Sequence, residues 1–443
     1  MYADRRYTLW PRGLFALLLL TLTSLAHAAR IDIQHWETTN GARVYFVPAM
    51  ELPIVDIQLV FDAGSAHDGS HAGLAQLTSR MLAEGAGDMG ADAIAERFEG
   101  LGAQFGADAQ RDMAVLTLRS LSDASYLDPA LDTLATIVRA PTFAAQPFER
   151  ERSRLLIDLQ SAEQSPSDIA EDAFYRAVYG QHPYASPVLG STESVQALTR
   201  DDLANFHREY YVARNAVVAI VGALSRAQAE QIVERALGSL PEGATATPVA
   251  EVSGARQAER IRIEFPSSQT HVLVGQPGIS RLDPDYFPLY VGNYVLGGSG
   301  LVARVSEEVR EKRGLAYSAY SYFTPMRAQG PFTLGLQTRN DQAEQALTVL
   351  FDTLNHFIAE GPTAAELIAA KKNITGSFPL RIASNQNIVG NLAVIGFYGL
   401  PLDYLDTFNS RVEAVNGDQI RNAFHRRIDP ATMVTVTVGQ SAK

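Results

Sequence analysis

The chain contains no cysteine among its 443 residues. Disulfides, zinc fingers, thiolate catalysis and iron–sulfur clusters are therefore excluded. Basic residues are outnumbered by acidic ones, 37 against 49, which gives a formal net charge of −12. Because nucleic acids need a basic surface and no long Lys/Arg run occurs, we expect no nucleic-acid partner. The composition, with 46% apolar and 19% charged residues, is that of a globular protein and excludes disordered and collagen-like classes.

Residues 1–28 have the three parts of a secretory signal peptide. Three arginines precede an apolar run over residues 14–22, and Ala26-His27-Ala28 then provides a small-x-small cleavage site. The apolar run is shorter than the ~20 residues of a membrane-spanning helix. An uncleaved N-terminal anchor is the alternative. We predict export to a periplasm and no transmembrane segment after the signal is removed.

The rest of the chain carries similar segments at a long, constant spacing. Asp132-Thr133-Leu134 recurs as Asp352-Thr353-Leu354, about 220 residues later. Phe206-His207-Arg208 precedes an apolar strand-like run, and Phe424-His425-Arg426 precedes another. This spacing favours a duplicated domain over chance similarity between two unrelated domains.

A stretch rich in Pro, Gly, Ala and Thr separates the two halves and is typical of a linker. We therefore predict an N-terminal domain over 29–240, a linker over 241–258 and a C-terminal domain over 259–443. Alternation of apolar and polar residues near 113–119 and 332–338 indicates antiparallel strands. The predicted fold class is α+β, with two tandem homologous domains, each a mainly antiparallel sheet with helices packed on one face.

The segment from Gly73 to Gly85 has the frame of a metal-binding helix but lacks its chemical residues. It resembles the pitrilysin/insulinase metallopeptidases, the inverzincins, whose helix carries H-x-x-E-H. Two histidines one turn apart hold zinc there, and the glutamate acts as general base. Gln76, Ser79 and Arg80 stand at these positions. Glutamine is a poor zinc ligand, serine cannot replace the base, and arginine is a permanent cation.

The family's third zinc ligand is a glutamate on a later helix, with another glutamate seven residues before it. The resemblance places Asp158 at the ligand position and Glu151 at the earlier one. One carboxylate cannot make a zinc site, so we predict that this chain binds no metal. Arg80 is expected to face Asp158 or Glu151, because a partly buried cation needs a partner.

Other histidines offer weaker alternatives. His67 and His71 lie four residues apart, but the glycines around them favour a loop with solvated histidines and Ser70 as a possible helix N-cap. His182-Pro183-Tyr184 also resembles a family segment, and the proline favours a structural role there. No Gly-x-Ser-x-Gly motif marks a serine hydrolase.

The second half keeps two motifs of the same family nearly residue for residue, a Gly-rich turn over 293–301 and a helix-to-strand segment over 309–318. The resemblance implies that the first motif shapes the substrate chamber through Gly297, Gly298 and Gly300. It implies that Arg310 and Tyr317 complete the active site by donating hydrogen bonds to a peptide carbonyl oxygen.

The residues alone allow a plainer interpretation of the second half. Arg310 would pair with Glu307 on its own helix, and Tyr317 would pack on the sheet. A phosphate-binding role for the glycines is weaker, because no Gly-Lys-Ser/Thr follows them.

The resemblance covers about residues 32–440 and implies a chain that forms half of a clam-like chamber. We predict the non-catalytic subunit of a heterodimeric zinc metallopeptidase, inactive alone, with zinc held by a homologous partner and peptides as substrates. The alternative is an inactive peptide-binding or scaffold protein of the same fold. Retention of Arg310 and Tyr317 favours the first function, because a scaffold needs no donor for an oxyanion.

Overall fold

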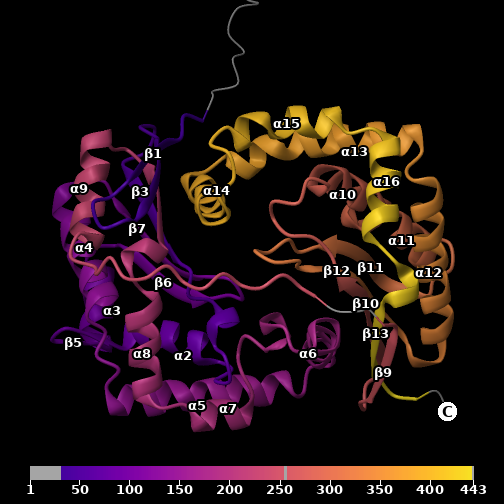
Figure 1. The fold of residues 1–443 in the computed structure, drawn as a ribbon, viewed down its shortest axis with the longest axis horizontal. Coiled ribbons are helices and arrows are strands. Elements are labelled where there is room, and N and C mark those ends of the chain that lie inside the picture. The colour runs from indigo at the N-terminus through magenta and orange to yellow at the C-terminus, as the bar shows by residue number, and fades with distance from the viewer. Residues whose placement is uncertain (1–30, 254–256, 442–443) are drawn as a thin grey trace, which may run out of the picture. The chain divides into compact units, whose positions relative to one another are not determined.

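The computed structural model describes residues 31–253 and 257–441, so the predicted signal peptide lies outside the described residues. From Ile33 onward the chain forms one compact unit built on two large sheets (Figure 1). The first sheet has the order β1 (Gln34–Glu37), β2 (Arg43–Pro48), β8 (Ala216–Gly222), β3 (Ile54–Phe61), β7 (Ala114–Leu121) and β6 (Gln104–Ala109). Its strands are antiparallel except for the parallel pair β2 and β8.

The second sheet repeats this arrangement. Its order is β9 (Glu259–Glu264), β13 (Val434–Gly439), β10 (Gln269–Pro277), β12 (Pro331–Arg339) and β11 (Ala316–Phe323). β9 and β13 are its parallel pair, as β2 and β8 are in the first sheet. The predicted α+β class and the duplication of a mainly antiparallel sheet are thus confirmed. Residues 241–253 form neither helix nor strand, while the domain boundaries at 240 and 259 stay a prediction.

Helices fill the segments between the strands, and capping boxes begin several of them, as at Ser191, Thr199 and Thr363. The first half contains α2 (Leu74–Met81), α3 (Ala91–Gly100), α4 (Ala124–Arg139), α5 (Ala145–Ala162), α6 (Pro166–Tyr179), α7 (Thr192–Ala197), α8 (Arg200–Tyr210) and α9 (Arg226–Leu237). A short hairpin of β4 (Gly85–Ala86) and β5 (Met89–Gly90) follows α2. The second half contains α10 (Tyr286–Asn293), α11 (Arg304–Ser306), α12 (Ala343–Glu360), α13 (Ala364–Ser377), α14 (Asn385–Tyr398), α15 (Tyr404–Ala414) and α16 (Gly417–Arg427). None of the helices in the described ranges is long and apolar enough to span a bilayer.

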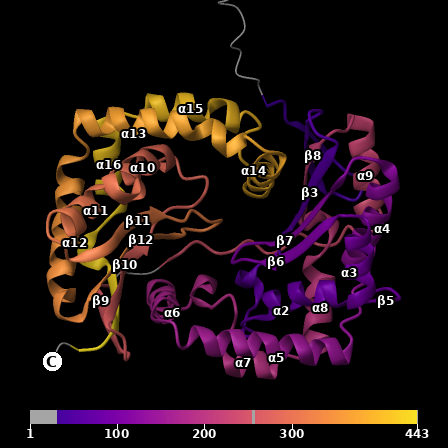
Figure 2. The same ribbon diagram turned by 180° about the vertical axis from the view of Figure 1, so that it is seen from behind.

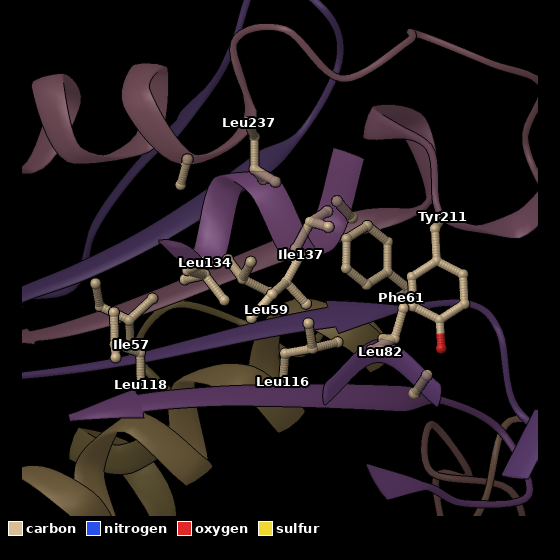
Figure 3. Close-up of a cluster of buried hydrophobic side chains, with 14 of the residues drawn as sticks. Ile57, Leu59, Phe61, Leu82, Leu116, Leu118, Leu134, Ile137, Tyr211 and Leu237 are labelled. Atoms are coloured by element: carbon tan, nitrogen blue, oxygen red, sulfur yellow. The ribbon is translucent and has the colours of Figure 1, made fainter. Parts of the chain in front are cut away.

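The core of the first half lies between its sheet and the helices of the same half. Alternate residues of β7 are buried, which is the pattern expected of a strand with one covered face. Leu116 and Leu118 of β7 lie beside Ile57 and Leu59 of β3, and Leu134 of α4 packs near them (Figure 3). Burial of such side chains contributes about 1.5–3 kcal/mol each to folding.

Each sheet also receives one helix from the opposite half. Helix α14 of the second half lies on β8 and β3, and helix α6 of the first half lies on β10 and β13 (Figures 1 and 2). A Cβ placed on Gly396 of α14 would lie 2.5 Å from a methyl carbon of Val217, and one on Gly275 of β10 would lie 2.8 Å from Phe174 of α6. This exchange explains why β8 and β13 are buried along their whole lengths. Each sheet therefore has helices of its own half on one face, as predicted, and one helix of the opposite half on the other face.

The two halves meet at the buried carboxylate of Asp112, which lies between β6 and β7. Tyr184 donates its hydroxyl hydrogen to Oδ1 at 2.5 Å, and Tyr398, at the end of α14, donates to Oδ2 at 3.0 Å. The backbone N–H of Arg327, between β11 and β12, donates to Oδ2 at 2.7 Å. The predicted structural role of the segment containing Tyr184 is thereby confirmed.

Replacing Asp112 is expected to loosen the junction between the halves. In Asp112→Ala, the donors on Tyr184, Tyr398 and Arg327 lose their shared acceptor, and each unpaired buried group costs about 1–3 kcal/mol. We expect the free energy of unfolding in urea to fall by about 3 kcal/mol or more. Asp108→Ala, at an exposed position on β6, is the control and should change it by less than about 0.5 kcal/mol. Equal effects of the two substitutions would contradict this role of Asp112.

Candidate functional site

Helix α2 carries the degenerate metal positions, and Asp68 fixes the start of this helix. Its carboxylate accepts hydrogen bonds from the backbone N–H groups of Gly73 and Ala75, both at 2.8 Å. Gly73 is the N-cap, with a φ of 90° and Leu189 O only 2.8 Å from where a Cβ would lie, so a glycine is required. The expectation that Ser70 caps the helix is wrong, because Asp68 supplies the acceptor from within the preceding loop.

Arg80 of α2 forms an ion pair with Asp158 of α5. Its Nη2 lies 2.8 Å from Oδ2 of Asp158, so the predicted contact is confirmed. The side chains are 24% and 47% exposed, and such a pair contributes at most about 1 kcal/mol to stability. Its consequence is chemical: a guanidinium at the second histidine position neutralises the acid at the third-ligand position.

Glu151, two helical turns before Asp158 on the same face of α5, belongs to a wider network of charges. It is buried, and Nη1 of Arg154 lies 2.5 Å from its Oε1. Burial and the nearby Glu84 carboxylate raise the pKa of Glu151, while Arg154 and Arg80 lower it. Glu84 in turn pairs with Arg150. The charges around α2 and α5 are thus balanced by arginines.

The other two degenerate positions face the protein interior. The Oε1 atom of Gln76 is buried without a hydrogen-bond partner in the described part of the chain. Ser79 is fully buried and lies beside the Tyr211 hydroxyl. Nowhere in residues 31–253 and 257–441 do three histidine, aspartate or glutamate side chains gather in a group that could hold a metal ion. Gln76, Ser79, Arg80 and Asp158 therefore do not fit zinc.

The histidine pair near the start of α2 has a structural environment. His67 lies 2.9 Å from Oδ1 of Asp62 through its Nε2, and its ring stacks on Tyr210. Its side chain is only 7% exposed, so the expectation of a solvated histidine is wrong at this position. His71 is exposed, as expected. The two histidines do not combine in one site.

The Gly-rich segment continues helix α10 and is not the turn expected from the sequence. Residues Tyr294–Gly298 form a π-helix, and Gly300–Val302 form a 3₁₀ turn. Gly297 lies so close to β11 that an added Cβ would be 2.2 Å from Ser321 N. Asn293 and Ser321, both buried, exchange two hydrogen bonds at 3.0 and 2.7 Å. This contact draws the segment onto the strand, which only the absence of a side chain at Gly297 permits.

Arg310 and Tyr317 lie together, as the sequence predicts for a shared site. Arg310 belongs to a second π-helix, Glu307–Glu311, which follows α11, and the chain reverses at Gly314 with a φ of 61°. The guanidinium carbon of Arg310 lies 5.0 Å from the centroid of the Tyr317 ring. Such a cation–π contact contributes about 0.5–1 kcal/mol at an exposed site. π-Helical segments occur frequently at functional sites.

Tyr317 projects from a β-bulge on the edge strand β11. Ala316 pairs with Thr338, and Ser318 pairs with Gln337, so Tyr317 is the extra residue. A bulge of this kind re-aims a side chain, and Tyr317 is 78% exposed. The plainer interpretation of the pair is wrong in both parts. Glu307 pairs with Lys312, Arg310 lies 3.3 Å from Glu311, and Tyr317 does not pack on the sheet.

A pocket of about 610 Å³ opens beside the Gly-rich segment. Gly297, Gly298 and Gly300 line it, whereas Arg310 and Tyr317 do not. The structure therefore divides the predicted residues of the second half between a pocket, which the glycines line, and the contact of the partly buried Arg310 with the exposed Tyr317. Sequence reasoning missed the tyrosines and arginines that complete the pocket, since they are dispersed over several elements.

The chain is similar in sequence to known proteins. The sequence matches the family model described as insulinase (peptidase family M16) over residues 47–192 and the model described as peptidase M16 inactive domain over residues 197–374. The chain is 30% identical to the non-peptidase homolog YmxG of Helicobacter pylori over 398 residues, which cover 87% of this chain and 89% of that protein. It is 27% identical to the uncharacterized zinc protease YmxG of Bacillus subtilis, with 87% and 94% covered.

Solved structures are also similar. A crystal structure of a peptidase M16 inactive domain from Pseudomonas fluorescens is 42% identical to this chain and has a TM-score of 0.90, covering 93% of this chain and 98% of that one. A protease from Helicobacter pylori, 19% identical with a TM-score of 0.86 over 92% of this chain and 99% of that one, shares the fold.

Two substitutions on α2 test whether the ion pair has replaced a metal site. In Gln76→His/Arg80→His, two imidazoles one turn apart join the Asp158 carboxylate, and three such ligands hold zinc. We expect this variant to bind about one zinc per chain in equilibrium dialysis, and Asp158→Asn on the same background to lose it. The matched control is Gln76→His alone, which keeps the Arg80 cation and should bind none. Zinc binding unaffected by Asp158→Asn would contradict the proposed convergence of positions 76, 80 and 158.

Proposed function

Because this chain belongs to the peptidase M16 (insulinase) family, we propose that it is a catalytically inactive member that acts as the non-catalytic subunit of a heterodimeric zinc peptidase. The observation that carries the first part is the ion pair between Arg80 and Asp158. It joins two positions at which a zinc-dependent relative would need ligands. No base stands at position 79 either, since Ser79 is buried in the core.

The second part of the proposal concerns Arg310 and Tyr317. Their chemistry is that of two hydrogen-bond donors side by side, suited to a peptide carbonyl oxygen that gains negative charge during hydrolysis. Donors of this kind are most effective where water is excluded. Tyr317 is 78% exposed in this chain, so its hydroxyl needs a covering surface. A partner subunit placed over β11 would supply that surface and the metal that this chain lacks.

The same proposal assigns the zinc to one of the two chains and places both chains in one compartment. This chain binds no zinc, its homologous partner holds it, and peptides are the shared substrate. Both chains act in a periplasm, to which the signal predicted over residues 1–28 directs this one. The purified chain is expected to contain no stoichiometric zinc by elemental analysis.

Complementation measures the role of the two donors. We expect the chain alone to leave a quenched peptide intact, and its mixture with an exported zinc-bearing relative to cleave it. Tyr317→Phe removes only the hydroxyl and should lower kcat of the mixture by about 10²-fold or more, with little effect on dimer formation. Arg310→Ala should lower kcat and raise KM, because a cation that holds a carbonyl acts in both states.

Tyr126→Phe is the matched control, because Tyr126 is also an exposed tyrosine and lies on α4, far along the chain from β11. It should leave kcat unchanged. If Tyr317→Phe and Arg310→Ala both support the partner at the wild-type rate, the donor role is refuted. The alternative function, a peptide-binding or scaffold protein, would then take its place.

A further inference from the structure

The pocket beside the Gly-rich segment contains two arginines without an acidic partner. Arg281 follows β10, and Arg381 precedes α14, and both line the pocket. Neither guanidinium forms an ion pair with any described residue, although carboxylates outnumber basic side chains in this protein. Nε of Arg281 is buried and lacks a hydrogen-bond partner within those same residues. An unpaired buried donor is unfavourable, and an acceptor supplied by a ligand would remove that penalty.

Two stacked tyrosines hold the arginines in place. The guanidinium carbon of Arg281 lies 5.2 Å from the ring centroid of Tyr286, and that of Arg381 lies 5.9 Å from Tyr290. The two rings are parallel within 3°, with centroids 6.0 Å apart. Each cation therefore lies over the face of one tyrosine of this pair, and although Arg381 also has a hydrogen bond to Tyr290, further N–H groups at the edges of both guanidinium groups can donate to an acceptor.

The rest of the pocket is lined mainly by aromatic residues, apolar residues and glycines, and Asn293 and Ser321 also line it. Tyr320 and Tyr322 of β11 stack on each other at 5.6 Å and line the wall together with Phe323 and Ile279. No aspartate or glutamate is among the described residues that line it. Large apolar side chains next to the lining residues in sequence are exposed, namely Leu282, Leu301, Val302 and Leu380. The surface thus combines positive charge with apolar area, which suits an anionic group attached to an apolar one.

We propose that this pocket binds a peptide through a carboxylate that lies next to an apolar or aromatic side chain. The carboxylate accepts hydrogen bonds from Arg281 and Arg381, and the neighbouring side chain packs against the tyrosines. A C-terminal carboxylate and an Asp or Glu side chain have the same chemistry and are the two possible sources. This inference deepens the proposed function, since it names the class of peptide that the Gly-rich segment helps to bind.

The position of the pocket in the fold agrees with the binding of a peptide's end or of an extended peptide segment. The residues that line the pocket come from α10, the edge strand β11 and the segment that leads into α14. Tyr317 is on the same edge strand but outside the pocket. A peptide held by its carboxylate at one end of β11 can therefore pass Tyr317 without displacing the pocket residues.

Fluorescence anisotropy with three labelled octapeptides tests the proposal on this chain alone. One peptide ends in Leu-Phe with a free carboxylate and has no acidic side chain, the second is its C-terminal amide, and the third is the amide with Glu before Phe. We expect the first or the third to bind at least about tenfold more tightly than the second. Preference for the first identifies the chain end as the source, and preference for the third identifies an acidic side chain.

Arg281→Met and Arg381→Met should each weaken binding of the preferred peptide about tenfold and remove its advantage over the neutral amide. The control is Arg260→Met, which removes the same charge from an exposed position on β9. Arg381 is exposed, so its variant remains informative if Arg281→Met unfolds. Equal binding of the three peptides, no binding of any, or an equal effect of Arg260→Met would overturn the proposal. None of these outcomes involves turnover, so the roles of Arg310 and Tyr317 are tested separately.

Discussion

The carboxylate of Asp112 lies where the two halves of the chain meet, and it has to be satisfied there because it is buried. Its two oxygens accept from Tyr184, from Tyr398 and from the backbone of Arg327, which come from different parts of the sequence. Helices α6 and α14 also join the halves, because each of them packs on the sheet of the opposite half. Together these contacts make one compact unit of two sheets that could each have been a separate domain. This compact unit fixes the positions of all the candidate site residues.

The degenerate metal positions on α2 and α5 and the pair Arg310–Tyr317 differ in their surroundings. Around α2 and α5, every position that would handle zinc now has a structural partner or a place in the core, as Arg80 and Ser79 illustrate. Around β11, Arg310 and Tyr317 remain together, with Arg310 partly buried and Tyr317 exposed to solvent. A bulge that displays a tyrosine and two π-helical segments contribute little to stability by themselves. Their retention is understandable if a partner or a peptide uses this surface.

Local chemistry made part of the structure predictable. The ion pair of Arg80 followed from the need of a partly buried cation for a partner and from the family resemblance, which places Asp158 at the third-ligand position, and the duplicated sheet followed from repeated segments about 220 residues apart. A glycine directly after a helical segment is typical of a left-handed position, and the φ of 61° at Gly314 agrees with this rule. Each of these features has a signal in the sequence itself, namely an unpaired charge, a repeated segment or a glycine after a helix.

Contacts between distant segments were not predictable in the same way. The partners of Asp112 come from three separate loops or helix ends, and no local pattern links them. The packing of one helix from the opposite half on each sheet has one signal in the sequence. The runs 217–221 and 434–438 contain few or no strongly polar residues, as expected of strands that are covered on both faces. The π-helix at Tyr294–Gly298 replaced the expected turn because the Asn293–Ser321 contact pulls that segment onto β11. The pocket arginines, Arg281 and Arg381, are a hundred residues apart and have no motif.

We propose that a zinc-bearing relative needs this chain for full activity. The most direct measurement is the rate at which such a relative, at fixed concentration, cleaves a quenched peptide as the wild-type chain is added. We expect the cleavage rate to rise as this chain is added and to saturate at a one-to-one ratio of the two chains. A rate that stays at the level of the relative alone, under conditions in which both chains are folded, would contradict it.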